Sequence, residues 1–109
     1  MSANDLRSMR EVLIKSLADH PIGLAVIETI DEVISASSRF NFWFGTDAKR
    51  SLNETELIAL LDEYGTIVDS YKSGYQAVVA KAPGAVDQFL STLRSARDRL
   101  RSLTPSAPA

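Results

Sequence analysis

The sequence predicts an all-α fold, an antiparallel up-down bundle of four helices, on the strength of three observations. Apolar residues recur every three or four positions through most of the chain, which is the period of a helix with one buried face. No window alternates apolar and polar residues for long enough to indicate a strand. The turn signals between the periodic segments are short, and short connections favour antiparallel neighbouring helices.

The first periodic segment predicts a helix from about Ala3 to Asp19. Ser2 is the predicted N-cap of this helix. We expect the helix to end before Pro21, because a proline pushes the residue before it, here His20, out of the α region. The apolar stripe of this helix contains Leu6, Met9, Leu13 and Leu17.

The second predicted helix has Pro21 in its first turn and ends at Gly45. Proline suits the first turn of a helix, and glycine is a common left-handed stop. Residues 46–51, which include Lys49 and Arg50, are predicted to form a polar loop. The apolar stripe of this helix contains Val26, Ile27, Ile30, Val33, Ile34, Ser37, Phe40 and Phe44.

The third helix has the clearest start signal in the chain. Asn53 is a predicted N-cap whose capping box is completed by Glu56, and Leu52 and Leu57 occupy the positions of a hydrophobic staple. The stripe keeps its phase across Gly65, so we predict one long helix, in which this glycine allows a neighbouring helix to approach closely. The stripe contains Leu57, Leu61, Tyr64, Val68, Tyr71, Tyr75 and Val78.

The fourth helix is predicted from about Ala85 to Leu103, after a tight corner at residues 81–84. Its inward-facing residues are Val86, Phe89, Leu90, Leu93, Ala96, Leu100 and Leu103. Residues 104–109 form a tail rich in proline, alanine and serine, which we expect to be disordered. Residues 1–103 are therefore predicted to form a single helical-bundle domain.

Composition limits the possible functions. The chain of 109 residues contains no cysteine, which excludes disulfides, thiol catalysis and thiolate metal sites. Its net charge of -2 predicts no general electrostatic attraction to nucleic acid or to acidic membranes. No apolar stretch approaches the roughly 20 residues of a membrane span, and the start of the chain lacks the apolar segment of a secretory signal. A cytoplasmic location is the resulting expectation.

A dense aromatic run at residues 40–44 is the best sequence indication of a contact surface. In a helix, Phe40, Trp43 and Phe44 share one face, while Phe42 points in another direction. Two interpretations remain open at this point. The rings either close the end of the bundle core or form a patch that contacts a partner, since aromatic residues are enriched at interfaces as well as in cores.

We therefore predict a non-enzymatic interaction or regulatory protein that self-associates as a homodimer or docks a protein partner. The contact is predicted at the aromatic end of the second helix, with Phe42 and Trp43 as apolar anchors and Arg39 and Arg50 as a polar rim. No catalytic residue, cofactor or metal is predicted. The full set of predicted partner-binding residues is Arg39, Phe40, Phe42, Trp43, Phe44 and Arg50.

A small-molecule-binding bundle, including an enzyme, is the first alternative. Tyr64, Tyr71 and Tyr75 lie along the stripe of the third helix, so their hydroxyls are candidate ligand-binding groups in the bundle interior. The sole histidine, His20, is preceded three residues earlier by Leu17 rather than by a glutamate. The chain therefore lacks the Glu-x-x-His pattern of di-iron bundles.

The second alternative is a nucleic-acid contact through a basic stripe on the fourth helix. Arg94, Arg97 and Arg101 recur at helical spacing there, with Arg99 beside them. An opposing interpretation is that these arginines pair with the acidic side of a neighbouring helix. Counting outward from the 81–84 corner places Arg97 opposite Asp69, and places Arg101 within reach of Asp62.

Overall fold

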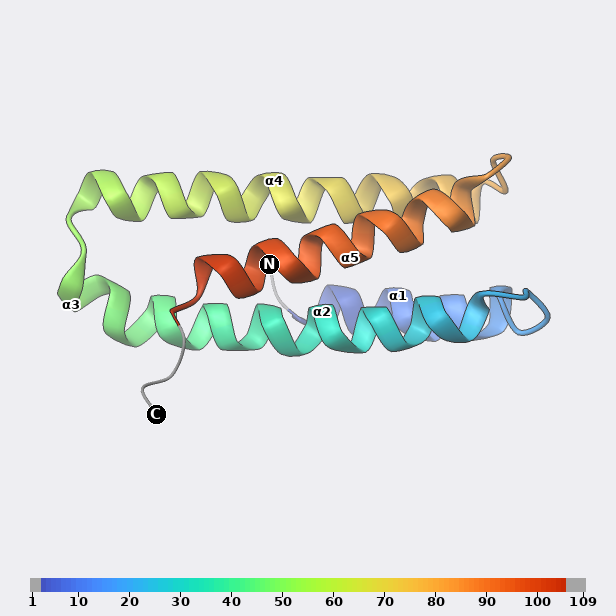
Figure 1. Ribbon diagram of the computed structural model, residues 1–109, viewed down its shortest axis with the longest axis horizontal. Helices are drawn as coiled ribbons and strands as arrows, with labels where there is room; N and C mark the ends of the chain where they lie inside the picture. The colour runs from blue at the N-terminus through green and yellow to red at the C-terminus, as the bar shows by residue number, and fades with distance from the viewer. Residues whose placement is uncertain (1–2, 106–109) are drawn as a thin grey trace.

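The computed structural model describes residues 3–105, with side chains from residue 5 onward, and this part of the chain is all-α as predicted (Figure 1). Four long helices, α1 (Ala3–Ser16), α2 (Gly23–Trp43), α4 (Glu54–Val79) and α5 (Ala85–Leu103), pack into a bundle. Two short segments, η1 (Phe44–Ala48) and α3 (Lys49–Ser51), follow α2 directly. The predicted N-cap Ser2 and the tail residues 106–109 lie outside the described residues.

In Figure 1 the two longest helices, α2 and α4, run along opposite edges of the view with α5 between them, and the chain reverses direction at each connection. Helix α5 packs against both α2 and α4, whereas α1 packs mainly against α2. An ion pair between Asp5 and Lys72, 4.0 Å apart, links α1 to α4. The molecule is elongated, with extents of 46 × 27 × 20 Å.

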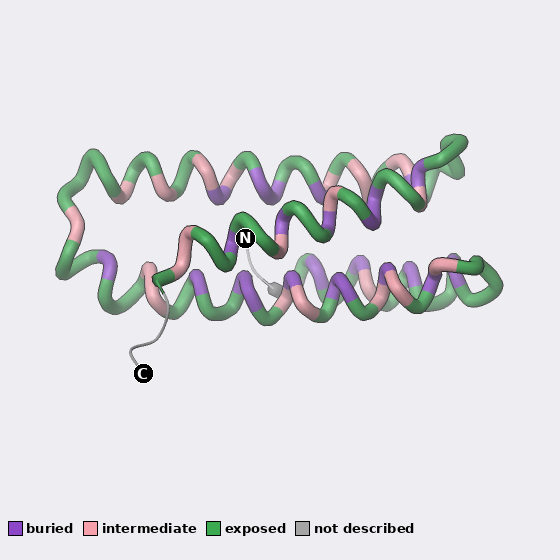
Figure 2. Tube along the Cα trace, viewed as in Figure 1, coloured by how far each residue is buried: buried purple, intermediate pink, exposed green. Residues whose placement is uncertain are grey.

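The core lies along the inner faces of the four long helices (Figure 2). The apolar spacing of each segment explains why these faces are buried, since positions three and four apart share one side of a helix. All four stripe residues predicted for the first helix are buried, including Leu17 just after α1, as are most of those predicted for the other three helices. The largest fully buried side chains of the core include Leu13, Ile30, Phe40, Phe89 and Leu93.

The prediction that the first helix reaches Asp19 is wrong, because α1 ends at Ser16 and residues 17–19 form a turn. The second helix starts at Gly23, so Pro21 lies in the turn rather than in the first helical turn. The amide of Ile22 donates to Nδ1 of His20 at 3.2 Å, so a side chain of the turn satisfies one of its backbone amides.

The predicted stop at Gly45 and the predicted loop at 46–51 are also wrong. Gly45 lies in the π-helical segment η1, and the chain stays helical until Leu52, whose φ of -114° and ψ of 148° are extended. Two observations accompany this continuation. The Thr46 hydroxyl donates to the carbonyl oxygen of Phe42 at 2.8 Å, and the side chain of Ala48 is fully buried.

The start of α4 matches the sequence prediction closely. The Asn53 side chain accepts a hydrogen bond from the Glu56 amide at 2.9 Å, and the Glu56 carboxylate accepts one from the Asn53 amide at 3.3 Å. This is the predicted capping box. Helix α4 then continues through Gly65 without a break, and α5 has the predicted bounds, Ala85–Leu103.

The corner between α4 and α5 is closed by two residues with positive φ. Lys81, with φ of 59°, donates its amide to the carbonyl of Val78, and the amide of Ala82 reaches back to the carbonyl of Ala77. These two bonds form a Schellman motif with lysine in the position usually taken by glycine. Gly84, with φ of 70°, then serves as the N-cap of α5.

Candidate interaction surface on the second helix

The aromatic run at 40–44 divides between core and surface. The Phe40 ring is buried and stacks on the Tyr64 ring of α4, with 5.0 Å between ring centroids and 7° between planes. Trp43 and Phe44 are half-buried and contact Phe40, with centroids 6.0 and 5.7 Å away. Phe40 therefore joins α2 to α4, and Trp43 and Phe44 pack against Phe40.

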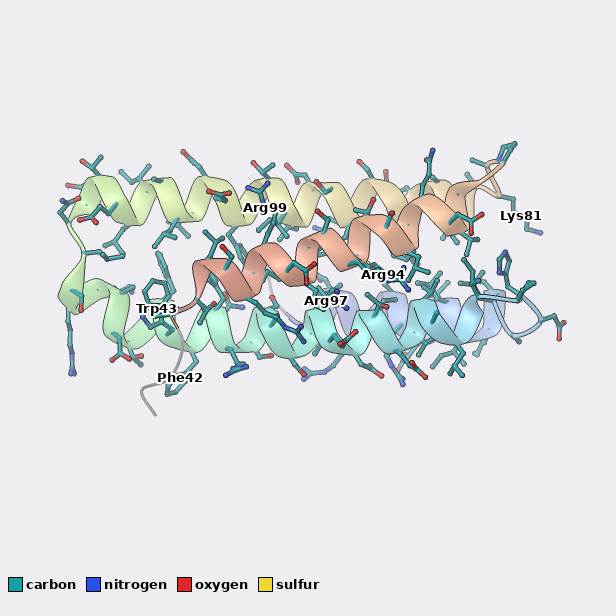
Figure 3. The ribbon with its side chains drawn as sticks, viewed as in Figure 1. Phe42, Trp43, Lys81, Arg94, Arg97 and Arg99 are labelled. Carbon is teal, nitrogen blue, oxygen red and sulfur yellow. The ribbon has the colours of Figure 1, made fainter. Side chains whose placement is uncertain are left out.

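Phe42 lies on the opposite side of α2 and points away from α4 (Figure 3). Its exposed fraction is 73%. A second large apolar residue of the same helix, Leu24, is 72% exposed. The two residues are eighteen positions apart, which is five turns of helix, so they lie on one line along α2, about 27 Å apart.

This line belongs to a continuous exposed strip, which we call the outward face of α2. Its members recur with alternating spacings of four and three residues, and every one of them is exposed. Helices α1 and α5 pack against α2 and leave every residue of this strip exposed, while Asp31 and Ser35 also line a hollow of about 380 Å³ beside Arg10 of α1. The outward face of α2 consists of Leu24, Glu28, Asp31, Ser35, Ser38 and Phe42.

Charge changes sign along this strip. Glu28 and Asp31 lie near its beginning, and Arg39 lies beside Phe42 near its end. Asp31 accepts from Arg10 of α1, with 2.7 Å between Nε and Oδ1. Within residues 3–105, Glu28 and Arg39 form no ion pair, so both are available to a partner. The other predicted rim residue, Arg50, is exposed on α3, beyond the strip.

The basic stripe of α5 is largely neutralised by carboxylates, but its predicted partners are wrong. Arg97 binds Glu32 of α2 at 3.1 Å and its own neighbour Asp98 at 2.9 Å, rather than Asp69. The hydrogen bonds and charges of Asp98 and Glu32 raise the pKa of Arg97. The prediction failed because it paired α5 with α4 alone, whereas this side of α5 faces α2.

The remaining arginines of the stripe divide between the two neighbouring helices. Arg101 reaches Glu32 at 3.6 Å, rather than Asp62 of α4, and Arg99 pairs with Glu63 of α4. Arg94 forms no ion pair in the described part of the chain. Figure 3 shows Arg94, Arg97 and Arg99 along α5. Nucleic-acid binding by this stripe stays a prediction.

The three tyrosines of α4 have different environments. Tyr64 is buried, and its hydroxyl shares a hydrogen bond of 2.9 Å with the buried hydroxyl of Ser37 and accepts a longer one, 3.4 Å, from Asn41. Tyr71 is also buried. Its burial, with smaller contributions from Tyr64 and Asp5, raises the pKa of its hydroxyl. Tyr75 is half-buried.

Two further hollows of the surface are not lined by these tyrosines. One of about 380 Å³ lies between α4 and α5 and is lined mainly by small hydroxyl side chains, such as Thr66 and Ser95, beside Arg99. The other, of about 400 Å³, lies between the α1–α2 turn and the α4–α5 corner and is lined partly by His20 and Lys81. Nδ1 of His20 accepts a backbone hydrogen bond, so Nε2 carries the proton of the neutral ring.

Among the residues that the structure describes, no group of three or more histidine, aspartate or glutamate side chains is arranged to hold a metal ion. None of the helices formed by residues 3–105 is long and apolar enough to cross a membrane.

The fold and its surface define this chain as a small all-α bundle with an exposed, partly apolar strip on one long helix. No protein-family model matches the sequence, and comparisons with curated proteins and with solved structures returned no match.

The sequence signal that identifies Leu24 as a surface residue was present but was not used. Leu24 follows Pro21 and Gly23 closely and has the same helical phase as Phe42, opposite the stripe of Val26, Ile30 and Val33. Two large apolar residues in the polar phase of an amphipathic helix are the pattern that indicates a contact strip.

Proposed function

We propose that this protein is a non-enzymatic helical interaction protein that docks another protein chain through the outward face of α2. The observation that supports this function is the shared line of Leu24 and Phe42, which are the two most exposed large apolar side chains among the described residues. Single apolar residues on a surface are common and need no explanation. Two on one line of one helix, with charged residues between them, resemble the anchors and rim of a helix-packing interface.

The size of the surface limits the strength of the contact. Burying a leucine or phenylalanine side chain gains about 1.5–3 kcal/mol, and association costs at least about 4 kcal/mol in lost translation and rotation. Two anchors on each partner therefore support a reversible contact rather than an obligate one. Trp43 and Phe44 assist by packing on Phe40, which holds the end of α2 against α4.

Photo-cross-linking in cells that express the full chain tests this function. A photoreactive amino acid at position 42 or 24 should give covalent adducts with a protein, whether a second copy or a different chain. The matched control is position 61 of α4, where Leu61 is also exposed but lies off the outward face of α2. If position 61 gave the same adducts, or positions 42 and 24 gave none, the outward face of α2 would not be the docking surface.

A further inference from the structure

We propose that the chain docked on the outward face of α2 is a second copy of this protein, with the two α2 helices antiparallel. This inference rests on the proposed function and names the partner of the same surface. The two copies are related by a two-fold axis that passes between the two α2 helices at the level halfway along α2 between Leu24 and Phe42, near Asp31 and Ser35 of the strip. The contact is isologous, so each pairing occurs twice.

The positions of the apolar anchors support this arrangement. With the axis halfway between them, Leu24 of each copy lies against Phe42 of the other, and all four exposed side chains are covered together. A parallel arrangement would instead place Phe42 against Phe42 and Leu24 against Leu24. The residues of the strip alternate between spacings of four and three. Two packed helices stay in contact over several turns when their contact residues have this spacing.

The charges along the strip distinguish the two directions. In the antiparallel arrangement, Glu28 of one copy lies opposite Ser38 of the other, next to Arg39. The Glu28 carboxylate of each copy can therefore pair with the Arg39 guanidinium of the other, once at each end of the contact. A parallel arrangement would place Glu28 beside Glu28 and Arg39 beside Arg39. Antiparallel packing therefore satisfies the charges and the apolar residues at the same time.

The middle of the strip is compatible with close approach of the helices. Ser35 and Ser38 are small, and Asp31 of one copy faces Ser35 of the other. The charge of Asp31 is already balanced by Arg10 of α1, at 2.7 Å, which limits repulsion between the two aspartates near the axis. A strip one helix wide falls below the roughly 800 Å² per partner of a standard interface, so the dimer should dissociate on dilution.

Engineered cysteines test the arrangement directly, because the chain has none of its own. Leu24→Cys and Phe42→Cys are made as separate full-length variants, then mixed and oxidised. The mixture should form a disulfide-linked dimer with one cysteine from each variant, and each mixed dimer keeps one intact Leu24 to Phe42 contact. Either variant alone should not cross-link, because its two cysteines would lie about 27 Å apart across the axis.

The matched control is Leu61→Cys mixed with Phe42→Cys, which should not cross-link. Cross-linking by Phe42→Cys alone would show a parallel contact and overturn the proposal. Failure of the Leu24→Cys and Phe42→Cys mixture to cross-link more than this control would also overturn it.

Charge reversal provides a second measurement. Light scattering across about a hundredfold range of protein concentration should show a monomer–dimer equilibrium for the native chain. Glu28→Arg and Arg39→Glu should each raise the dimer dissociation constant about tenfold, and the double variant should return it to within about threefold of the native value. These side chains are exposed, so the fold is expected to persist, which circular dichroism checks.

The outcomes separate this inference from the proposed function. A native chain that stays monomeric at every concentration would show that the second copy is not the partner. Position-specific adducts with a different protein would then still support docking through the outward face of α2. Loss of both the dimer and those adducts would contradict both proposals. A dimer that is unaffected by Phe42→Ser would overturn the proposed contact.

Discussion

At the scale of single residues, the structure places a small polar group inside an apolar core. Ser37 is 1% exposed and shares a hydrogen bond of 2.9 Å with Tyr64, which also accepts from Asn41. A buried hydroxyl without a partner is costly, so each of these groups makes the burial of the other tolerable. No buried side-chain nitrogen or oxygen atom lacks a partner in the part of the chain that the structure describes.

The Ser37 to Tyr64 bond leads to a prediction of strong coupling. Tyr64→Phe should lower the free energy of unfolding by about 1–2 kcal/mol, because the Ser37 hydroxyl then stays buried with its partner removed. Adding Ser37→Ala to Tyr64→Phe should restore part of this loss rather than add to it. Urea denaturation of the native chain, both single variants and the double variant measures the coupling. Additive losses would show that the bond contributes no net stability.

Tyr71 predicts a loss of stability in alkali. Its pKa is raised in the folded state above the ordinary value of about 10, mainly by burial. Below that pH the hydroxyl is protonated in both states and stability is unaffected. Above it the unfolded chain ionises first, so the free energy of unfolding should fall by up to about 1.4 kcal/mol per pH unit.

Denaturation at a series of pH values measures this slope. Tyr71→Phe removes the titrating group and should make the slope shallower above pH ~10. Tyr75→Phe is the matched control on the same helix, and it should keep the slope because Tyr71 is still present. Equal slopes in the native chain and in Tyr71→Phe would show that another group causes the alkaline loss.

At the scale of helices, close approach is decided by glycine at a position that the sequence did not indicate. We predicted that Gly65 allows a neighbouring helix to approach, but a Cβ atom there would meet nothing within 4 Å. The approach occurs instead at Gly74, where a Cβ would lie 2.7 Å from Cδ1 of the fully buried Phe89 of α5. The two glycines are nine positions apart, which is two and a half turns of helix, so they lie on opposite sides of α4, and Phe89 of α5 packs on the side of Gly74.

These two glycines give opposite predictions for one substitution. Gly65→Ala should raise the free energy of unfolding by about 0.5–1 kcal/mol, because alanine loses less conformational entropy in a helix and has space here. Gly74→Ala should lower it by about 1–3 kcal/mol, because the Phe89 ring must move within a packed core. Thermal and urea denaturation of both variants provide the test. Stabilisation by Gly74→Ala would show that the core accepts the methyl group without strain.

At the scale of the whole molecule, the helices differ in length. Helix α4 has 26 residues and α5 has 19, and α1 has only 14. Figure 1 shows that α2 with η1 and α3, together with the start of α4, extend beyond the ends of α1 and α5. We call residues 44–60 the two-helix end. It has fewer packed neighbours than the middle of the bundle, and Ile58 is about half-exposed there.

The two-helix end is predicted to open locally before the rest of the molecule unfolds. Backbone amides of residues 44–60 should exchange with solvent at least about tenfold faster than those around Ile30, Val33 and Leu93, which are fully buried in the core. Hydrogen exchange followed by mass spectrometry of peptides measures the difference. Equal protection of both regions would show that the π-helical segment and its neighbours are as stable as the bundle core.

The local part of the fold was determined by the sequence itself. Hydrophobic spacing of three and four residues predicted the four long helices, and the capping box at Asn53 and Glu56 located the start of α4 because such signals act within one turn of the chain. The chain beyond Gly45 was mispredicted for a related reason. It continues as a π-helical segment in which Ala48 is fully buried, and the local pattern of a polar stretch after glycine does not indicate that burial.

Only the tertiary structure decided which surface is available for binding. The aromatic run indicated a contact, but Phe40 is buried against Tyr64 while Phe42 is left exposed. Helical phase places Leu24 in line with Phe42, and only the structure shows that both side chains stay exposed. The partners of Arg97 likewise depend on α5 lying against α2 as well as α4. Helical periodicity shows which residues share a face, but the identity of the neighbour across that face is set by long-range packing, which no local pattern encodes.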